Sequence, residues 1–355
     1  MSDPIPLRHG RALPNRLALA PMTNRQSLPD GTLTQTEIDW LLARARGGFG
    51  LTMTAAAFVS RAGQAWSGQL GVSSDAHLSG LEALARGVHE AGGVVAVQLH
   101  HGGLRADAAA SGEPVVAPWA DAATGARALT TAEVGRVVED FAAAASRAER
   151  AGFDGVELHG AHGYLLGQFL DATHNTRTDA YGGDFAGRTR IVHEAIDAVR
   201  AATGPAFQVG LRLSPERFGV DLGEMVRLAG DVLARGDLDY VDVSLWDVAK
   251  LPAGATGGPL LIDHFLGLDR HGTALGVAGA LSSVASVQWV LDKGADLAFI
   301  GKGAIADHAF ARHAMADAAY AAPAFPVTRD HLRAEHLGEP FVDYFSRSWP
   351  ALVKD

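Results

Sequence analysis

The segment Val156-Glu157-Leu158-His159-Gly160-Ala161-His162-Gly163-Tyr164-Leu165 joins a short apolar run to a turn that carries two imidazoles and a phenol. The apolar run is typical of a strand, and parallel α/β proteins place their chemistry in the turns that follow strands. His159 and His162 can converge on one small acceptor atom, and Tyr164 is close enough to give a proton to the same ligand. The segment therefore predicts a parallel sheet with a functional site at its carboxyl edge.

Other apolar segments of strand length lie on both sides of this one, and helical periodicity separates them. With Val156–Leu158, the predicted strands are Leu17–Met22, Leu51–Ala57, Val94–Leu99, Gln208–Leu213, Tyr240–Ser244, Leu275–Val277 and Leu297–Ile300. Eight strands alternating with helices predict an α/β fold of the (β/α)8 TIM-barrel type. A doubly wound open sheet would need a Gly-rich turn after the first strand, and Met22-Thr23-Asn24-Arg25 is not one.

Helices are expected between the strands. They run from Thr36 to Gly47-Gly48 and over Leu78–Ala91, Val134–Ala151, Thr189–Ala202, Val226–Ala234, Val284–Lys293 and Phe310–Ala319. Thr130 and Glu133 have the spacing of a capping box. His101–Ala128 and Trp246–Gly272 are expected to be long loops at the barrel mouth. We expect residues 1–322 to form the barrel, and residues 323–355 to be a C-terminal extension that packs on the barrel or on a neighbouring subunit.

The composition narrows the class of protein. The chain has 355 residues, 48% of them hydrophobic, and a formal charge of −10, which argues against nucleic acid or an anionic membrane surface as a partner. It contains no cysteine, which excludes disulfides, thiolate nucleophiles and iron–sulfur clusters. No stretch is typical of a signal peptide or a membrane span, so a cytoplasmic location is expected. The oligomeric state stays open, with a homodimer or a larger homo-oligomer as one outcome.

Polar residues at other strand ends extend the predicted site. Gln98 ends the third strand, where an amide could hold a planar heterocycle. Arg212 lies inside an apolar strand and needs an anionic or electron-rich partner, either a nearby carboxylate or a cofactor. Glycines mark the ends of the last two strands, at Gly276-Val277-Ala278-Gly279-Ala280 and at Gly301-Lys302-Gly303, where barrels often bind a phosphate. Trp246 could wall a pocket or pack under a loop.

Several motifs taken together resemble the old yellow enzyme family of flavin-dependent ene reductases. They are Ala20-Pro21-Met22-Thr23, Val97-Gln98-Leu99-His100, the HGAHGYLLGQFL run that begins at His159, Asn175–Gly183, Arg212, Gly279 and Gly301-Lys302. The resemblance covers roughly Asn15 to His313. It implies a barrel with non-covalent FMN, reduced by NADPH or NADH, and an activated alkene as the small-molecule substrate.

The resemblance also implies roles for individual residues. The isoalloxazine ring would lie against Pro21, Met22, Thr23, Ala56 and Gln98, with Arg212 at its pyrimidine edge. The phosphate would be held by Gly279, Ala280, Gly301 and Lys302. His159 and His162 would bind the carbonyl or nitro oxygen of the substrate, Tyr164 would be the proton donor, and Arg25 and Trp246 would be further substrate contacts.

This chain departs from the family pattern at three of these positions. Thr23 stands where one branch has a cysteine that tunes the flavin potential, so a different potential is expected. Arg25 stands where that branch has a tyrosine. Lys302 replaces an arginine, which keeps the charge and loses the bidentate fork.

Three other functions remain open from the sequence. A metal-dependent hydrolase on the same barrel would use His100, His159 and His162 as ligands, although no carboxylate–histidine pair at helical spacing accompanies them. A flavoprotein without catalytic activity is another. A flavin enzyme working in the oxidative direction, as a dehydrogenase or demethylase, is the third.

Overall fold

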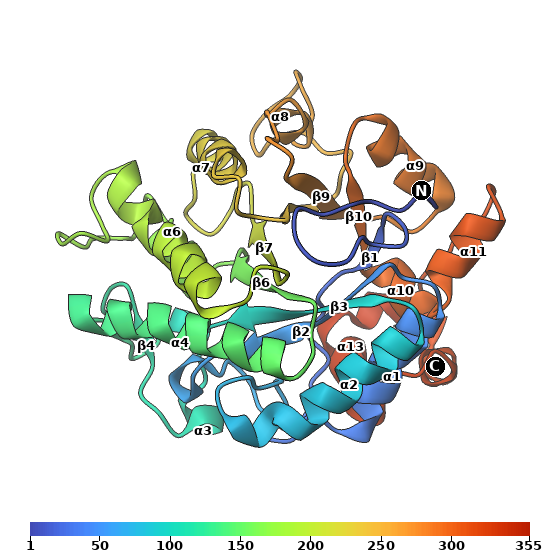
Figure 1. Cartoon of the computed structure of the whole chain (residues 1–355), viewed down its shortest axis with the longest axis horizontal. Coiled ribbons are helices and arrows are strands. Elements are labelled where there is room, and N and C mark those ends of the chain that lie inside the picture. Colours follow the sequence, from blue (N-terminus) through green and yellow to red (C-terminus); the bar gives the residue numbers. More distant parts are fainter.

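The core of the protein is a closed barrel of eight parallel strands, with helices around it (Figure 1). The computed structural model describes residues 1–355. In barrel order the strands are β1 (Leu17–Leu19), β10 (Leu297–Ile300), β9 (Ala274–Gly279), β8 (Tyr240–Trp246), β7 (Gln208–Leu213), β6 (Gly155–Gly160), β3 (Val94–His100) and β2 (Leu51–Phe58). The (β/α)8 barrel predicted from the sequence is therefore confirmed.

Seven helices that follow barrel strands lie on the outside of the barrel. They are α1 (Gln35–Arg46), α2 (Leu78–Glu90), α4 (Thr131–Arg150), α6 (Phe185–Ala202), α7 (Leu222–Ala234), α9 (Val284–Asp292) and α11 (Phe310–Ala316). The capping box at Thr130 and Glu133 is present. Helices α6 and α7 begin about a turn earlier than predicted, because Asp184 and Asp221 cap them ahead of the apolar periodicity.

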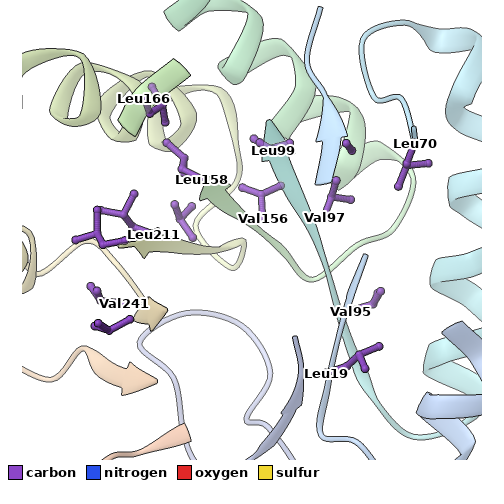
Figure 2. Close-up of a cluster of buried hydrophobic side chains, with 14 of the residues drawn as sticks. Leu19, Leu70, Val95, Val97, Leu99, Val156, Leu158, Leu166, Leu211 and Val241 are labelled. Carbon is purple, nitrogen blue, oxygen red and sulfur yellow. The ribbon is translucent and has the colours of Figure 1, made fainter. Parts of the chain in front are cut away.

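Side chains of each strand alternate between an apolar layer under the helices and the interior of the barrel. One face points outward to the helices, and Figure 2 shows this layer with Val95, Val97 and Leu99 of β3 beside Val156 and Leu158 of β6. The other face fills the barrel interior, where Tyr240 and Phe299 lie with their ring centroids 5.9 Å apart. Because both faces of these strands are buried, the strands appear in the sequence as short, nearly continuous apolar runs.

Short elements occupy the regions predicted to be long loops. Residues 101–128 hold the 3₁₀ turn η3 (Gly103–Arg105), α3 (Ala108–Ser111), β4 (Val116–Ala117) and β5 (Arg127–Ala128), and residues 246–272 hold α8 (Asp263–Leu266). Further short segments are η1 (Arg61–Gly63), η2 (Asp75–His77), α5 (Leu165–Phe169) and α10 (Lys302–Ala306). No helix of the protein combines the length and the apolar character needed to cross a membrane.

The last thirty or so residues pack against the same chain. They form β11 (Val327–Thr328), α12 (Arg329–Ala334), α13 (Glu339–Ser348), η4 (Pro350–Leu352) and β12 (Val353–Lys354), and β11 pairs in parallel with β12. The Phe341 ring meets the Trp40 ring of α1 edge-on, with centroids 5.4 Å apart. The Gly338 N–H donates to Gln26 Oε1 at 2.8 Å, which ties this tail to the loop after β1.

Candidate active site

A layer of polar side chains lies inside the carboxyl half of the barrel. Its members are alternate residues of four neighbouring strands, and their side chains point into the barrel. They are Gln98, His100, Glu157, His159, Arg212, Asp242 and Ser244. The strand register makes Gln98 the partner of Glu157 and Arg212 the partner of both His159 and Asp242. Residues that are far apart in sequence thus meet in one buried layer, above the apolar floor of the barrel.

His159 and His162 lie next to each other, as the sequence predicts. His159 Nε2 is 3.3 Å from His162 Nδ1, and the two rings are nearly perpendicular. The backbone turns sharply here, because His162 and Gly163 both have left-handed φ angles, of 60° and 66°. That turn aims the His162 side chain back toward the barrel, where its Nε2 lies 2.8 Å from Ser244 Oγ. A non-glycine residue held at positive φ is often a sign of a functional constraint.

Both imidazoles are neutral at ordinary pH. Burial lowers the pKa of His162 to about 3, with the nearby cations of Arg212 and Arg105 adding to the effect. Burial likewise brings the pKa of His159 well below its usual value, and the neighbouring His162 adds to the shift. A neutral imidazole has one N–H donor and one bare nitrogen, so each ring can present one hydrogen bond to a ligand.

Tyr164 lies directly after this turn and immediately before α5. Its ring centroid is 5.1 Å from that of His159 and 4.3 Å from that of His100, and the Arg105 guanidinium lies 4.4 Å above it. Burial raises the pKa of the Tyr164 phenol. The phenol therefore stays protonated and can act as a proton donor beside the histidine pair.

Arg212 has a carboxylate partner. Its Nη1 is 3.3 Å from Asp242 Oδ2, and both side chains are buried. Gln98 Nε2 donates to Glu157 Oε1 at 2.7 Å. Burial raises the pKa values of Glu157 and Asp242. The sequence left open whether Arg212 pairs with a carboxylate or with a cofactor. In the structure it pairs with Asp242, and it still has N–H groups that could donate to a cofactor.

The remaining predicted residues lie at the strand ends around this layer. Ala56 is the register partner of Gln98, and Pro21, Met22 and Thr23 follow β1. A Cβ added at Gly301 would have only Met22 Sδ at 3.8 Å and Ala20 Cβ at 4.0 Å near it, so the turn after β10 faces the β1 segment and is uncrowded. Ala280, after β9, has a φ of 53°. Lys302 is exposed and makes no ion pair.

The donor set around this space suits a flavin. Arg212 Nε and Nη1 are buried without a hydrogen-bond partner, and Gln98 Oε1 accepts no hydrogen bond. An amide and a guanidinium match the donor and acceptor edge of a pyrimidine ring. An unpaired lysine beside glycine turns matches a phosphate. The residues present therefore fit FMN.

Arg25 and Trp246 lie farther out on the rim. Trp246 is 52% exposed, its ring centroid is 6.1 Å from that of His162, and the Arg217 guanidinium lies 4.7 Å above it. Arg25 is also exposed, and its guanidinium lies 5.1 Å from the ring centre of Tyr344 in α13. Both rim residues have positive φ angles, 56° for Arg25 and 67° for Trp246.

His100, His159 and His162, the ligands of the metal alternative, do not form a group of three whose ligand atoms all converge on one point. Such a convergence occurs instead at Asp307, His308 and Glu335. There Glu335 Oε2 accepts from the backbone and ring of His308, and Asp307 accepts from His313 and Tyr320. Those carboxylates are already hydrogen-bonded, and His100 Nδ1 is held by Gln69 Nε2 at 3.0 Å.

A parallel barrel with paired imidazoles, a protonated phenol and a flavin-compatible donor set is consistent with a flavin-dependent oxidoreductase. Residues 2–255 match the model of the NADH:flavin oxidoreductase / NADH oxidase family, and the chain belongs to that family. It is an FMN-dependent NAD(P)H oxidoreductase, as the motifs led us to expect.

Similar proteins cover most of the chain. It is 35% identical to the probable NADH-dependent flavin oxidoreductase YqiG of Bacillus subtilis over 317 residues, 86% of this chain and 85% of that one. It is 33% identical to an NADPH dehydrogenase of Halalkalibacterium halodurans, over 82% of this chain and 87% of the relative. Among solved structures, an old yellow enzyme homologue from Zymomonas mobilis superposes with a TM-score of 0.81 at 27% identity, covering 97% and 98% of the two chains. Morphinone reductase superposes with a TM-score of 0.78 at 28% identity, covering 97% and 95%. The resemblance to the old yellow enzyme family is confirmed.

Five residues at the site were not predicted from the sequence: Glu157, Asp242, Ser244, Arg105 and Tyr344. Glu157 lies two residues before His159 and so shares its inward face, a signal that was available. Asp242 and Ser244 alternate in the same way along their strand. No local pattern marks Arg105 or Tyr344, which come from a 3₁₀ turn and from the tail.

Proposed function

We propose that this protein reduces the C=C bond of an alkene activated by a carbonyl or nitro group, with NADPH or NADH as the electron source. The observation that carries the proposal is the pair of neutral imidazole nitrogens of His159 and His162, 3.3 Å apart beside the protonated phenol of Tyr164. Hydride adds to the β-carbon of the alkene, and a proton adds to the α-carbon.

The cofactor would be held by three groups of residues. The first, along the ring, is Pro21, Met22, Thr23, Ala56 and Gln98. Arg212 would face the pyrimidine edge, where its positive charge favours the anionic reduced form. Gly279, Ala280, Gly301 and Lys302 would bind the phosphate. When bound, FMN supplies the hydride that the nicotinamide has delivered to it.

His159 and His162 would bind the substrate oxygen. Negative charge builds on that oxygen as hydride reaches the β-carbon, and two N–H donors aimed at it stabilise the transition state more than the ground state. Their low pKa values keep both rings neutral, so the donors do not themselves lose or gain a proton during the reaction.

Tyr164 would protonate the α-carbon. Its phenol keeps its proton because burial raises its pKa, and it stands beside the oxygen-binding pair. Arg25 and Trp246 would contact the part of the substrate that points out of the barrel.

The test is a spectroscopic cycle under anaerobic conditions. Adding NADPH or NADH to the purified yellow protein should bleach the flavin band, and 2-cyclohexenone should restore it. Tyr164→Phe keeps the ring and removes the proton, so it should bleach at the wild-type rate but recover about 10²–10⁴-fold more slowly.

Two results would contradict the proposal. One is a reduced flavin that no activated alkene reoxidises. The other is a Tyr164→Phe variant that recovers as fast as the wild type, which would remove the phenol from the reaction.

A further inference from the structure

We propose that Ser244 is a positioning residue that fixes the proton of His162 on Nδ1, so that His159 and His162 both present an N–H to one substrate oxygen. The inference rests on the proposed function, in which these two rings bind that oxygen. Ser244 ends the inward row of β8, 82 positions from His162, and is buried.

The tautomer of His159 follows from its backbone contact. The Ala161 N–H donates to His159 Nδ1 at 3.2 Å, so that nitrogen is the acceptor. Because the ring is neutral, its single proton is on Nε2. His159 thus points its N–H toward His162 Nδ1, 3.3 Å away.

His162 has two arrangements open to it. In one, His162 Nδ1 accepts from His159 and Nε2–H donates to Ser244, so the two rings satisfy each other and only one donor is left for a ligand. In the other, the Ser244 hydroxyl donates to His162 Nε2 at 2.8 Å, and the proton sits on Nδ1. Only the second arrangement gives two donors.

The surroundings of the Ser244 hydroxyl favour the second arrangement. Its other hydrogen-bond neighbour is Arg212 Nη2, a donor, through a long contact of 3.4 Å. The only acceptor within reach of the buried hydroxyl proton is therefore His162 Nε2. If His162 donated instead, that proton would lack a partner, which costs about 1–3 kcal/mol for a buried polar group. With the proton on Nδ1, two N–H donors face each other across 3.3 Å, so the second arrangement is complete when a substrate oxygen accepts from both.

The resulting geometry suits a single oxygen. Donor nitrogens 3.3 Å apart can both lie within ordinary hydrogen-bond distance, roughly 2.7–3.2 Å, of one acceptor. The Ser244 hydroxyl also contacts Arg212, which is proposed to face the cofactor, so it lies between that residue and His162, which is proposed to bind the substrate.

The first test reads the tautomer directly. The sample is holoenzyme containing ¹⁵N-labelled histidine, with excess cyclohexanone, the reduction product of 2-cyclohexenone, as a non-reacting carbonyl probe. Its ¹⁵N NMR spectrum should show a protonated Nδ1 and a bare Nε2 for His162. Assignment comes from the His162→Asn spectrum, in which that ring is missing. In Ser244→Ala no hydroxyl holds Nε2 as the acceptor, so a fraction of the molecules should carry the His162 proton on Nε2 instead. A wild-type spectrum with the proton on Nε2 would overturn the proposal.

The second test separates positioning from structure. Ser244→Ala should lower kcat/KM for 2-cyclohexenone about 10–10²-fold with unchanged FMN content, and Ser244→Thr, which keeps the hydroxyl, should recover most of it. In a His162→Asn background the amide always has an N–H to offer and tolerates positive φ. There Ser244→Ala should change kcat/KM less than twofold; an equal loss in both backgrounds would overturn the proposal.

The two proposals fail in different ways. If the wild type reduces no alkene, the proposed function fails while the NMR result still decides the tautomer. If alkene reduction proceeds and Ser244→Ala leaves both the His162 tautomer and kcat/KM unchanged, only the role of Ser244 is lost.

Discussion

Gln98 Nε2 donates to Glu157 Oε1 at 2.7 Å, across the register pair that joins β3 to β6 inside the barrel. This bond fixes which end of the Gln98 amide faces the carboxyl group and leaves Oε1 to accept from a ligand. Burial, with the Asp242 charge nearby, raises the pKa of Glu157 and keeps it protonated. A neutral acid below the amide leaves Arg212 and Asp242 as the ion pair of the layer.

Two substitutions of Glu157 should therefore distinguish the contribution of its hydrogen bond and packing to stability from that of its charge. Glu157→Gln keeps the acceptor for Gln98 and resembles the protonated acid, so the free energy of unfolding should change by less than about 1 kcal/mol. Glu157→Ala leaves the Gln98 N–H unpaired and opens a cavity, and should cost about 2–4 kcal/mol. Urea unfolding of both variants at one fixed excess of FMN measures this, and equal losses would show that the carboxylate form is the one that matters.

Glu37 predicts a pH dependence of stability. It is fully buried under the loop after β1, where it accepts hydrogen bonds from Asn24 Nδ2 and Ser27 Oγ, and burial raises its pKa to about 7 from an ordinary 4.5. Between pH 4.5 and about pH 7, the Glu37 carboxyl group is protonated in the folded state and mostly ionised in the unfolded state. The contribution of Glu37 to stability is thus present below pH 4.5 and lost as the pH rises through about 7.

Glu37→Gln can make the same two contacts without titrating. Between pH 5 and pH 8 the wild type should lose about 2–3 kcal/mol more unfolding free energy than this variant. Urea titrations of both proteins at the two pH values supply the comparison. Parallel pH profiles would show that Glu37 does not titrate in this range.

Lys302 should contribute to cofactor binding through its charge. It is exposed at the start of α10, after the Gly301 turn, and has no carboxylate partner. Lys302→Ala should raise the Kd for FMN about tenfold at low salt, with a smaller difference at high salt because an exposed charge is screened. Lys302→Arg is the matched control and should bind like the wild type. Riboflavin, which lacks the phosphate, should bind the wild type and Lys302→Ala equally; an effect of Lys302→Ala on riboflavin would place Lys302 away from the phosphate.

Phe341 should anchor the tail. It is 1% exposed and packs edge-on against Trp40, whereas Trp349 near the end of the chain is 40% exposed. Phe341→Ala should cost about 3–5 kcal/mol of unfolding free energy, the usual result for a buried aromatic. Trp349→Ala serves as the control and should cost clearly less. If Phe341→Ala were neutral, the tail would be a separate layer rather than part of the barrel's packing.

The barrel and the histidine pair were predictable because their signals are local. The strands are short apolar runs separated by helical segments, and His159, His162 and Tyr164 occupy one short segment whose turn holds them together. Arg25 and Trp246 lie in or beside loops at the rim of the barrel. From the sequence we could predict that they lie near the barrel mouth, but not which groups they contact.

The other contacts in the site depend on how residues of neighbouring strands are paired, and this register cannot be predicted from one sequence. Glu157 and Asp242 are each visible as inward residues, but their meeting with Gln98 and Arg212 needs the pairing of neighbouring strands. Ser244 reaches His162 only because β6, β7 and β8 lie side by side. The early starts of α6 and α7 come from aspartate caps outside the apolar period.

The contact between Gly338 and Gln26 spans 312 positions of the chain. During synthesis, Gln26 leaves the ribosome long before Gly338 does. The Gln26 side chain, in a loop next to the residues proposed to line the flavin, can therefore accept this hydrogen bond only after the tail has been made. The order of synthesis thus separates the first contacts of that loop from its last one.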